Sequence, residues 1–126
     1  MRAVDTNVLL RLLTRDDAKQ VAAAEEFVRL GAWVSHVVLA ETAWALDSLY
    51  GRRSVEIADA VEMLLEQQSL SIQDPDVVQA AVDGLRASPN VGFSDHLILA
   101  IARKAGHLPL GTFDRRLGKV DGAEKL

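Results

Sequence analysis

Short apolar segments alternate with longer stretches of helical periodicity along the chain, and this alternation limits the folds that it can adopt. The short segments are typical of buried strands, and the longer stretches repeat apolar residues at intervals of three and four. We expect strands at residues 2–5, 32–35, 70–73 and 108–113. We expect helices at residues 7–14, 17–30, 36–50, 54–65, 75–87 and 95–105. Strands that alternate with helices predict an α/β fold with a short, mostly parallel sheet.

Polar residues, proline and glycines mark the expected ends of these helices. The candidate N-caps are Asp16, Asp17, Ser54 and Ser94. Pro75 suits a first helical position, where its missing N–H has no intrahelical partner to lose. The expected terminators are Gly31, Gly51 and Gly106. After Asp114 we expect only a helical turn and a short edge strand.

The size and composition narrow the class of protein. The 126 residues predict one domain, residues 1–126. The absence of cysteine excludes disulfides and thiolate metal sites and is in keeping with a reducing cytoplasm. Asp5 and Arg11 interrupt the first apolar run, so we expect no signal peptide, and no apolar stretch has the length of a membrane span. Because the net charge is -4, binding of a polyanion would require local basic patches or a metal ion.

Four acidic residues are candidates for a ligand-binding site at the carboxyl ends of the predicted parallel strands. Asp5 ends the first expected strand, and Asp114 ends the last one. Asp95 lies in the first turn of an expected helix, and Glu41 lies in the helix after the second strand. Because ligands bind beyond the carboxyl ends of parallel strands, we expect all four side chains to meet at one edge of the sheet.

Each of these acids also has an ordinary structural explanation. Asp95 can act as a helix cap, and Asp5 and Asp114 can serve turns. Glu41 has apolar neighbours at helical spacing, which predicts an apolar face on which an unpaired carboxylate would be costly. A buried arginine is one partner that would relieve this cost. The joint placement of the four residues favours a common site.

Carboxylates that meet at one point repel one another, so some must be protonated or a cation must lie among them. A site with only oxygen ligands suits Mg²⁺ or Mn²⁺. Such sites commonly serve phosphoryl chemistry, in which the metal activates water and no side-chain nucleophile is needed.

Four sequence motifs resemble those of a known family. VDTNVLLRLL, ETAWAL, FSDHLILAIARKAG and GTFDRRL each contain one of the acids, in the order and the strand or helix context of the PIN-domain ribonucleases. The resemblance extends from Val4 to Leu117 and is closest to the VapC-type toxins of bacterial toxin–antitoxin pairs. It implies a PIN-like three-layer α/β sandwich in which helices flank a short, mostly parallel central sheet.

The resemblance also implies a Mg²⁺- or Mn²⁺-dependent endoribonuclease that hydrolyses single-stranded or loop RNA. The positions that match the family's catalytic and metal-binding acids are Asp5, Glu41, Asp95 and Asp114. Asn7 and Thr112 match auxiliary polar positions that orient carboxylates and water. The family further implies a homodimer and a cognate antitoxin protein that holds the toxin inactive.

Other residues are candidates for contacts with RNA or with the antitoxin. Arg115 and Arg116 directly follow Asp114, where they can meet an RNA backbone. His96 follows Asp95, where the family more often has a small residue, and can approach the RNA. The candidates for a groove that receives an antitoxin helix are Trp44, Leu49 and Tyr50, although tryptophans at such spacing commonly belong to a core.

Two other functions are compatible with an aspartate at a strand end. A phosphatase of the haloacid dehalogenase type requires a second aspartate two residues later, where this chain has Asn7.

A receiver-like or degenerate binding module of α/β fold is the non-enzymatic alternative. A receiver domain would need a lysine after a late strand, and the segment LPLGTFD has none. A degenerate PIN module would typically lack one acid, and all four are present. The nuclease is therefore the favoured hypothesis.

Overall fold

The computed structural model describes residues 1–126 and shows the combination of short strands and longer helices that the sequence predicts. The strands are β1 (Arg2–Ala3), β2 (Ala32–Val34), β3 (Leu70–Ile72), β4 (Leu110–Thr112) and β5 (Ala123–Lys125). The helices are α1 (Thr6–Thr14), α2 (Ala18–Val28), α3 (His36–Ser48), α4 (Ser54–Glu66), α5 (Pro75–Ala87) and α6 (Phe93–Ala105), with a 3₁₀ turn η1 (Leu117–Lys119) after β4. None of the helices has the length and hydrophobicity that a membrane crossing requires.

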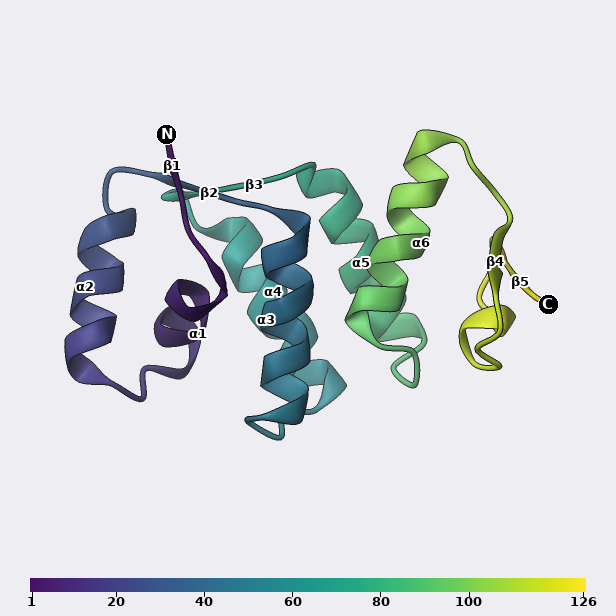
Figure 1. Ribbon diagram of the computed structural model, residues 1–126, viewed down its shortest axis with the longest axis horizontal. Coiled ribbons are helices and arrows are strands. Elements are labelled where there is room, and N and C mark those ends of the chain that lie inside the picture. The colour runs from purple at the N-terminus through teal and green to yellow at the C-terminus, as the bar shows by residue number, and fades with distance from the viewer.

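All strand pairs are parallel, as predicted, but the strands form two sheets instead of one. In the first sheet β2 lies between β1 and β3, with Ala3 paired to Trp33 and Val34 paired to Ile72. β4 and β5 form the second sheet by themselves. Figure 1 shows β1 and β4 on opposite sides of the molecule, with α3, α5 and α6 between them. The α/β class with short parallel sheets is confirmed, whereas the expected central sheet is divided.

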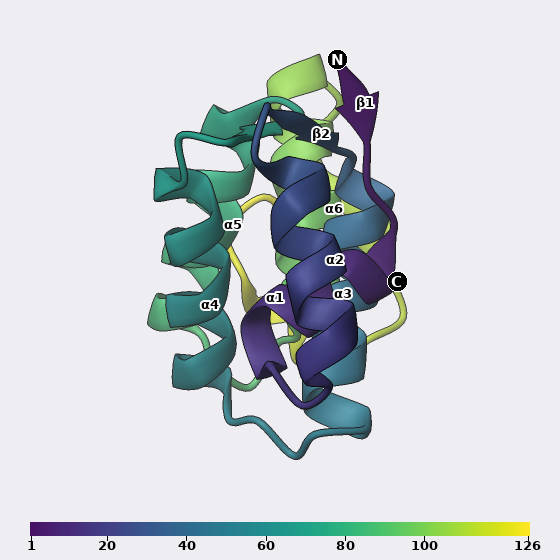
Figure 2. The same cartoon turned by 90° about the vertical axis from the view of Figure 1, so that its left-hand side faces the viewer.

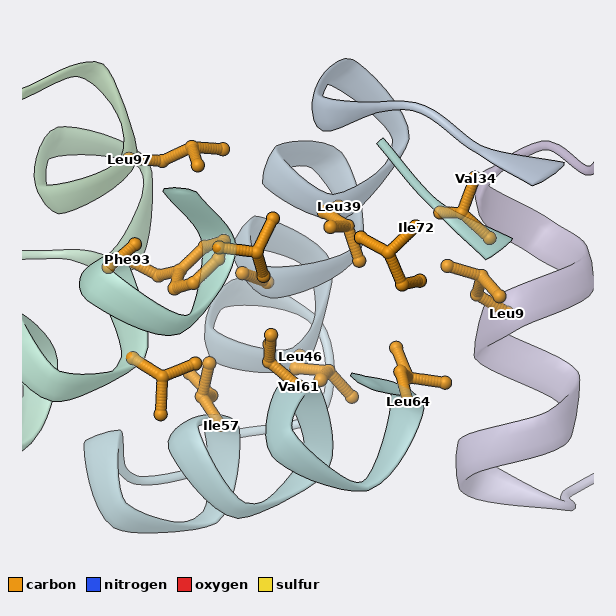
Figure 3. Packing of buried hydrophobic residues seen from close by; sticks show 14 of the residues in the cluster. Leu9, Val34, Leu39, Leu46, Ile57, Val61, Leu64, Ile72, Phe93 and Leu97 are labelled. Atoms are coloured by element: carbon orange, nitrogen blue, oxygen red, sulfur yellow. The ribbon is translucent and has the colours of Figure 1, made fainter. Parts of the chain in front are cut away.

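The hydrophobic core lies between the first sheet and the helices. Ala32 and Val34 of β2 are buried, while Trp33 between them is partly exposed, so one face of this sheet packs on the helices. Buried residues of all six helices complete the cluster, which Figure 3 shows around Leu39 and Ile72. Because each fully buried leucine or valine side chain contributes about 1.5–3 kcal/mol, this cluster is the main source of stability.

The helices pack as pairs around this core. α1 packs on α2 and on α3, and α5 packs on α4 and on α6. Figure 2 shows α2 in front of α1 and α3, with α4 and α5 to one side. The N-terminus of α3 is tied to the end of β3, since the His36 backbone N–H donates to Gln73 Oε1 at 2.9 Å. This contact sets the direction in which α3 leaves the sheet.

Several predicted helix ends are confirmed. Asp17 is the N-cap of α2, and its carboxylate accepts the Gln20 backbone N–H at 3.0 Å. Pro75 is the first residue of α5. Gly106 closes α6 in the left-handed conformation with φ 83°, which glycine adopts without steric cost.

The two serine caps are wrong. Ser54 is the first residue of α4, and its hydroxyl donates to the Pro89 carbonyl at 2.9 Å instead of accepting a backbone N–H of its own helix. α6 begins at Phe93, so Ser94 lies inside the helix and Gly92 holds the N-cap position. The N-cap position is held by Arg53 in α4 and by Gly92 in α6, so neither serine side chain caps its helix.

The C-terminal segment (residues 110–126) contains the predicted turn and edge strand as η1 and β5. It lies against α6, where Arg103 Nη2 donates to the Asp121 carbonyl at 2.8 Å and Gly122 packs against Leu99. Leu117 is its one buried residue, and no residue of the segment belongs to the core cluster. The segment is thus attached to the rest of the molecule through few side chains.

Candidate active site

The first group of site residues joins the end of β1 to α3. Asp5 is the N-cap of α1, and its Oδ1 accepts the Val8 backbone N–H at 3.3 Å. The next residue, Thr6, donates its hydroxyl to Glu41 Oε2 at 2.8 Å. Asp5, Thr6 and Glu41 form what we call the N-terminal half-site. The role of Thr6 was not predicted, although its position directly after Asp5 is a signal in the sequence.

Glu41 lies on the exposed face of α3, which corrects the expectation of an apolar face. The buried residues of this helix are Leu39, Thr42, Ala43, Ala45 and Leu46. Val37 and Trp44, two of the apolar neighbours that predicted burial for Glu41, are themselves exposed. The carboxylate of Glu41 therefore remains in contact with water and needs no buried arginine to stabilise it.

The second group of site residues joins the N-terminus of α6 to the end of β4. Asp95 lies half-buried in the first turn of α6. Burial raises the pKa of the Asp95 carboxyl, the nearby Asp114 carboxylate raises it further, and His96 acts in the opposite direction. Two carboxylates from different elements are thus close enough to repel each other, and a cation beside them would relieve that repulsion. Asp95, Thr112 and Asp114 form what we call the C-terminal half-site.

The orientation of Asp114 is set by three hydrogen bonds. Its Oδ1 accepts the backbone N–H groups of Arg116 and Leu117, both at 2.8 Å, which starts the turn into η1. Its own backbone N–H donates to Thr112 Oγ1 at 3.0 Å. Thr112 therefore holds the residue that carries the carboxylate. Asn7, the other auxiliary candidate, is exposed in the first turn of α1, two residues after Asp5.

Asp5 and Asp114 follow strands, Asp95 lies in the first turn of α6, and Glu41 lies within α3. The comparison with protein families identifies the family of this chain. The family model for the PIN domain matches residues 2–123. The chain belongs to the PIN domain family. PIN domains are generally metal-dependent nucleases, so this membership favours a nuclease over a haloacid-dehalogenase-type phosphatase. A comparison with curated proteins finds no match.

A divalent metal ion of the kind that PIN domains generally use needs several ligands around one point. The carboxylates of this PIN domain are suitable donors, but no three Asp, Glu or His side chains lie close enough to hold an ion in common. The predicted meeting of all four acids at one sheet edge is therefore not seen within one copy of the chain. The reason is topological, because β1 and β4 belong to different sheets.

A polar hollow beside Asp114 gives this acidic PIN domain a local basic surface. Its lining residues are Asn90, Asp114, Arg115, Arg116 and Lys119. The sequence predicted Arg115 and Arg116 but missed Lys119 and Asn90. Lys119 follows Arg116 by three residues, the spacing that places side chains on one side of a 3₁₀ turn. Asn90 comes from the loop before α6, and only the tertiary fold brings it there.

His96 has a packing role, contrary to the expected RNA contact. Its side chain is 3% exposed, and Nε2 lies 3.0 Å from the Ser88 carbonyl oxygen. The ring sits against Gly84 of α5, where an added Cβ would come within 2.6 Å of Nδ1. His96 therefore joins α6 to α5, and it does not reach the surface that faces the hollow.

The candidate partner residues of α3 do not share one groove. Trp44 lines a hollow between α3, α4 and α6 together with Arg52, Arg53, Phe93 and other residues. Leu49 is exposed outside this hollow. The Tyr50 hydroxyl is engaged elsewhere, since it donates to Asp16 Oδ2 at 3.2 Å. Of the three candidates, only Trp44 lines a hollow of the PIN domain on this side.

Proposed function

We propose that this PIN domain is an endoribonuclease that hydrolyses phosphodiester bonds of single-stranded or loop RNA in the cytoplasm. The observation that carries the proposal is the position of Asp114. Its carboxylate is held in a fixed orientation, lies near the carboxyl group of Asp95, and borders a hollow that contains three basic side chains. Carboxylates that attract a cation, beside basic groups that attract phosphate, are the combination that a phosphodiester substrate requires.

The proposed reaction requires side chains for metal binding and catalysis, for positioning and for contacts with phosphate. We assign catalytic and metal-binding roles to Asp5, Glu41, Asp95 and Asp114, and positioning roles to Asn7 and Thr112. Arg115, Arg116 and Lys119 contact phosphate groups of the RNA, because guanidinium and ammonium groups donate to phosphate oxygens. Mg²⁺ or Mn²⁺ is the proposed ion, since every proposed ligand is an oxygen.

We further infer that the protein acts as a VapC-type toxin with a cognate antitoxin. The motifs that resemble this group support the inference, as does the hollow around Trp44, whose side chain is 61% exposed. An antitoxin helix packed there would bury apolar surface that the PIN domain leaves in water. Expression of the chain without its antitoxin is expected to stop bacterial growth, and expression of Asp95→Asn is not.

The nuclease is tested with the purified, antitoxin-free chain and a mixed pool of single-stranded and structured RNAs. Cleavage is measured with Mg²⁺, with Mn²⁺ and with chelator, beside Asp95→Asn prepared in the same way. We expect cleavage that depends on the metal and is lost in the variant. Equal cleavage by both proteins would mean that the activity comes from a contaminant or another site. Absence of cleavage in both would favour the non-catalytic binding module.

A further inference from the structure

Two of the hollows described above meet at Asn90. This residue lies in the loop between α5 and α6, and it lines both the hollow around Trp44 and the hollow beside Asp114. Asn90 is exposed. Because one exposed residue borders both hollows, they are neighbours on the surface, and a flexible chain can run from one into the other.

The C-terminal half-site lies at this junction. Ser94 of α6 lines the hollow around Trp44, and Asp95 is the next residue. Asp114 lines the other hollow, and its carboxylate is near enough to contribute to the raised pKa of Asp95. A strand that runs through both hollows therefore passes the carboxylates to which we assign the cleavage reaction.

The hollow around Trp44 has cationic side chains that can bind phosphate. Arg52 and Arg53 lie in the loop between α3 and α4, at the same end of the molecule as the loop between α5 and α6 (Figure 1). Arg53 forms an ion pair with Glu56 at 3.3 Å, but its side chain is 77% exposed. Arg52 is exposed and belongs to none of the ion pairs of the chain.

Both hollows have a net positive charge, although the net charge of the chain is -4. Asp47 is the only acid that lines the hollow around Trp44, and Asp114 is the only acid that lines the other. In each hollow the basic residues outnumber the acid. Positive charge that continues from one hollow to the next is complementary to the backbone of a nucleic-acid strand.

Trp44 provides an aromatic surface on this path. It follows Glu41 by three residues, and both side chains lie on the exposed face of α3. Phe93, the other aromatic residue of the hollow, is buried. Proteins that bind single strands combine basic groups that follow the backbone with aromatic rings on which bases stack, and Trp44 beside Arg52 has this combination.

We propose that the hollow around Trp44 is a subsite for single-stranded RNA, in which a base stacks on the Trp44 ring and Arg52 binds a neighbouring phosphate. The strand continues past Asn90 into the hollow beside Asp114. This inference rests on the proposed function and extends it, because it assigns a base-binding position next to the site of cleavage. Stacking accepts every base, so the subsite selects unpaired RNA over duplex RNA and does not select a sequence.

Tryptophan fluorescence tests the subsite without any need for cleavage. The chain has two tryptophans, so Trp33→Phe leaves Trp44 as the only one. The variant also carries Asp5→Asn, which we expect to prevent cleavage and which changes the lining of neither hollow. The probes are a single-stranded oligoadenylate and an oligomer of the same length without bases. We expect oligoadenylate to quench the fluorescence to saturation and the abasic oligomer to leave it nearly unchanged.

The matched control is Trp44→Phe in the same Asp5→Asn background. It keeps Trp33, which lies on β2 and lines neither hollow. Its fluorescence should not respond to oligoadenylate.

Fluorescence anisotropy with labelled oligoadenylate measures the size of the effect. Trp44→Ala is expected to weaken binding by about 5- to 140-fold, the range found for the loss of one aromatic ring that stacks on a base. Trp44→Phe retains a ring and should recover most of this loss. Arg52→Ala should lower the slope of log affinity against log salt concentration by about one phosphate contact. Lys19→Ala is its control, since Lys19 is an exposed cation on α2 outside both hollows.

The outcomes separate the subsite from the proposed nuclease. Oligoadenylate that binds without quenching Trp44, or that binds Trp44→Ala as tightly as the parent, would overturn the subsite and leave the hollow to the antitoxin helix. Equal quenching by the abasic oligomer, or no binding of oligoadenylate, would overturn it as well. If the wild-type chain still cleaves RNA, the proposed function survives each of these results. Quenching and loss of affinity in a chain whose wild type cleaves no RNA would support the subsite and refute the nuclease.

Discussion

Residues 1–105 and the C-terminal segment of this PIN domain are built in different ways. The first region contains every member of the buried core cluster, drawn from all six helices and the first sheet. The C-terminal segment buries Leu117 alone and is attached mainly to α6. Yet this segment carries Thr112, Asp114 and the basic residues of the hollow. The comparison shows that the first region supplies the core together with Asp5, Glu41 and Asp95, whereas the C-terminal segment supplies candidate site residues without contributing to the core.

The largest expected effect on stability comes from the core. Leu9 is fully buried in the cluster, and Leu9→Ala is expected to lower the free energy of unfolding by about 2–5 kcal/mol, because it removes packed methyl groups and leaves a cavity. Urea denaturation followed by circular dichroism measures the change. Leu117→Ala is the matched control in the C-terminal segment and should cost clearly less. Equal losses would contradict a separate role for the two regions.

A second prediction compares the two half-sites through their threonines. Thr112→Val removes the acceptor for the Asp114 backbone N–H, and Thr6→Val removes the donor to Glu41. Each variant is expected to lower the RNA cleavage rate about tenfold, since a net hydrogen bond of about 1.4 kcal/mol corresponds to that factor. Thr14→Val is the control, because its hydroxyl donates to the Leu10 carbonyl away from both half-sites. A loss in one half-site only would show that the two do not serve the same reaction.

A third prediction concerns the basic hollow. The background for this test is Asp114→Asn, which we expect to prevent cleavage. In it, Arg116→Ala is expected to weaken RNA binding several-fold and to lower the slope of log affinity against log salt concentration by an amount that corresponds to about one phosphate contact. Fluorescence anisotropy at several salt concentrations measures both quantities. Arg29→Ala, which removes an exposed arginine paired with Glu26 on α2, is the control. If both variants weaken binding equally, RNA contacts the domain through its general charge and not through the hollow.

The smallest expected effect comes from an exposed ion pair in the first region. Lys104 Nζ donates to Asp76 Oδ1 at 3.1 Å, and this hydrogen bond holds the pKa of Asp76 below its ordinary value. The pair therefore stabilises the fold above the ordinary pKa of aspartate, and the contribution is lost as the pH falls through the lowered pKa. Asp76→Asn is expected to be slightly less stable than the wild type at pH 7 and equally stable at about pH 2. A difference that persists in acid would assign the effect to something other than charge.

The sequence alone determined the local structure and the positions of the candidate site residues within it. Helical periodicity, Pro75 and the glycines located the helices to within a few residues, because these signals act through neighbouring residues. The placement of Asp5 and Asp114 after strands, and of Asp95 at a helix start, follows from the same local patterns. The match of the PIN domain model over residues 2–123 agrees with the resemblance that the motifs indicated.

Only the tertiary structure decided which face each residue presents and which strands pair. Glu41 proved exposed and His96 proved buried, because burial depends on the elements that pack against a helix and not on its own periodicity. The division of the strands into two sheets, and with it the separation of the acids into two half-sites, depends on backbone hydrogen bonds between residues far apart in the sequence. The residues of a single short strand do not indicate which other strand it pairs with. The sequence therefore located each acid along the chain but not which acids lie close together.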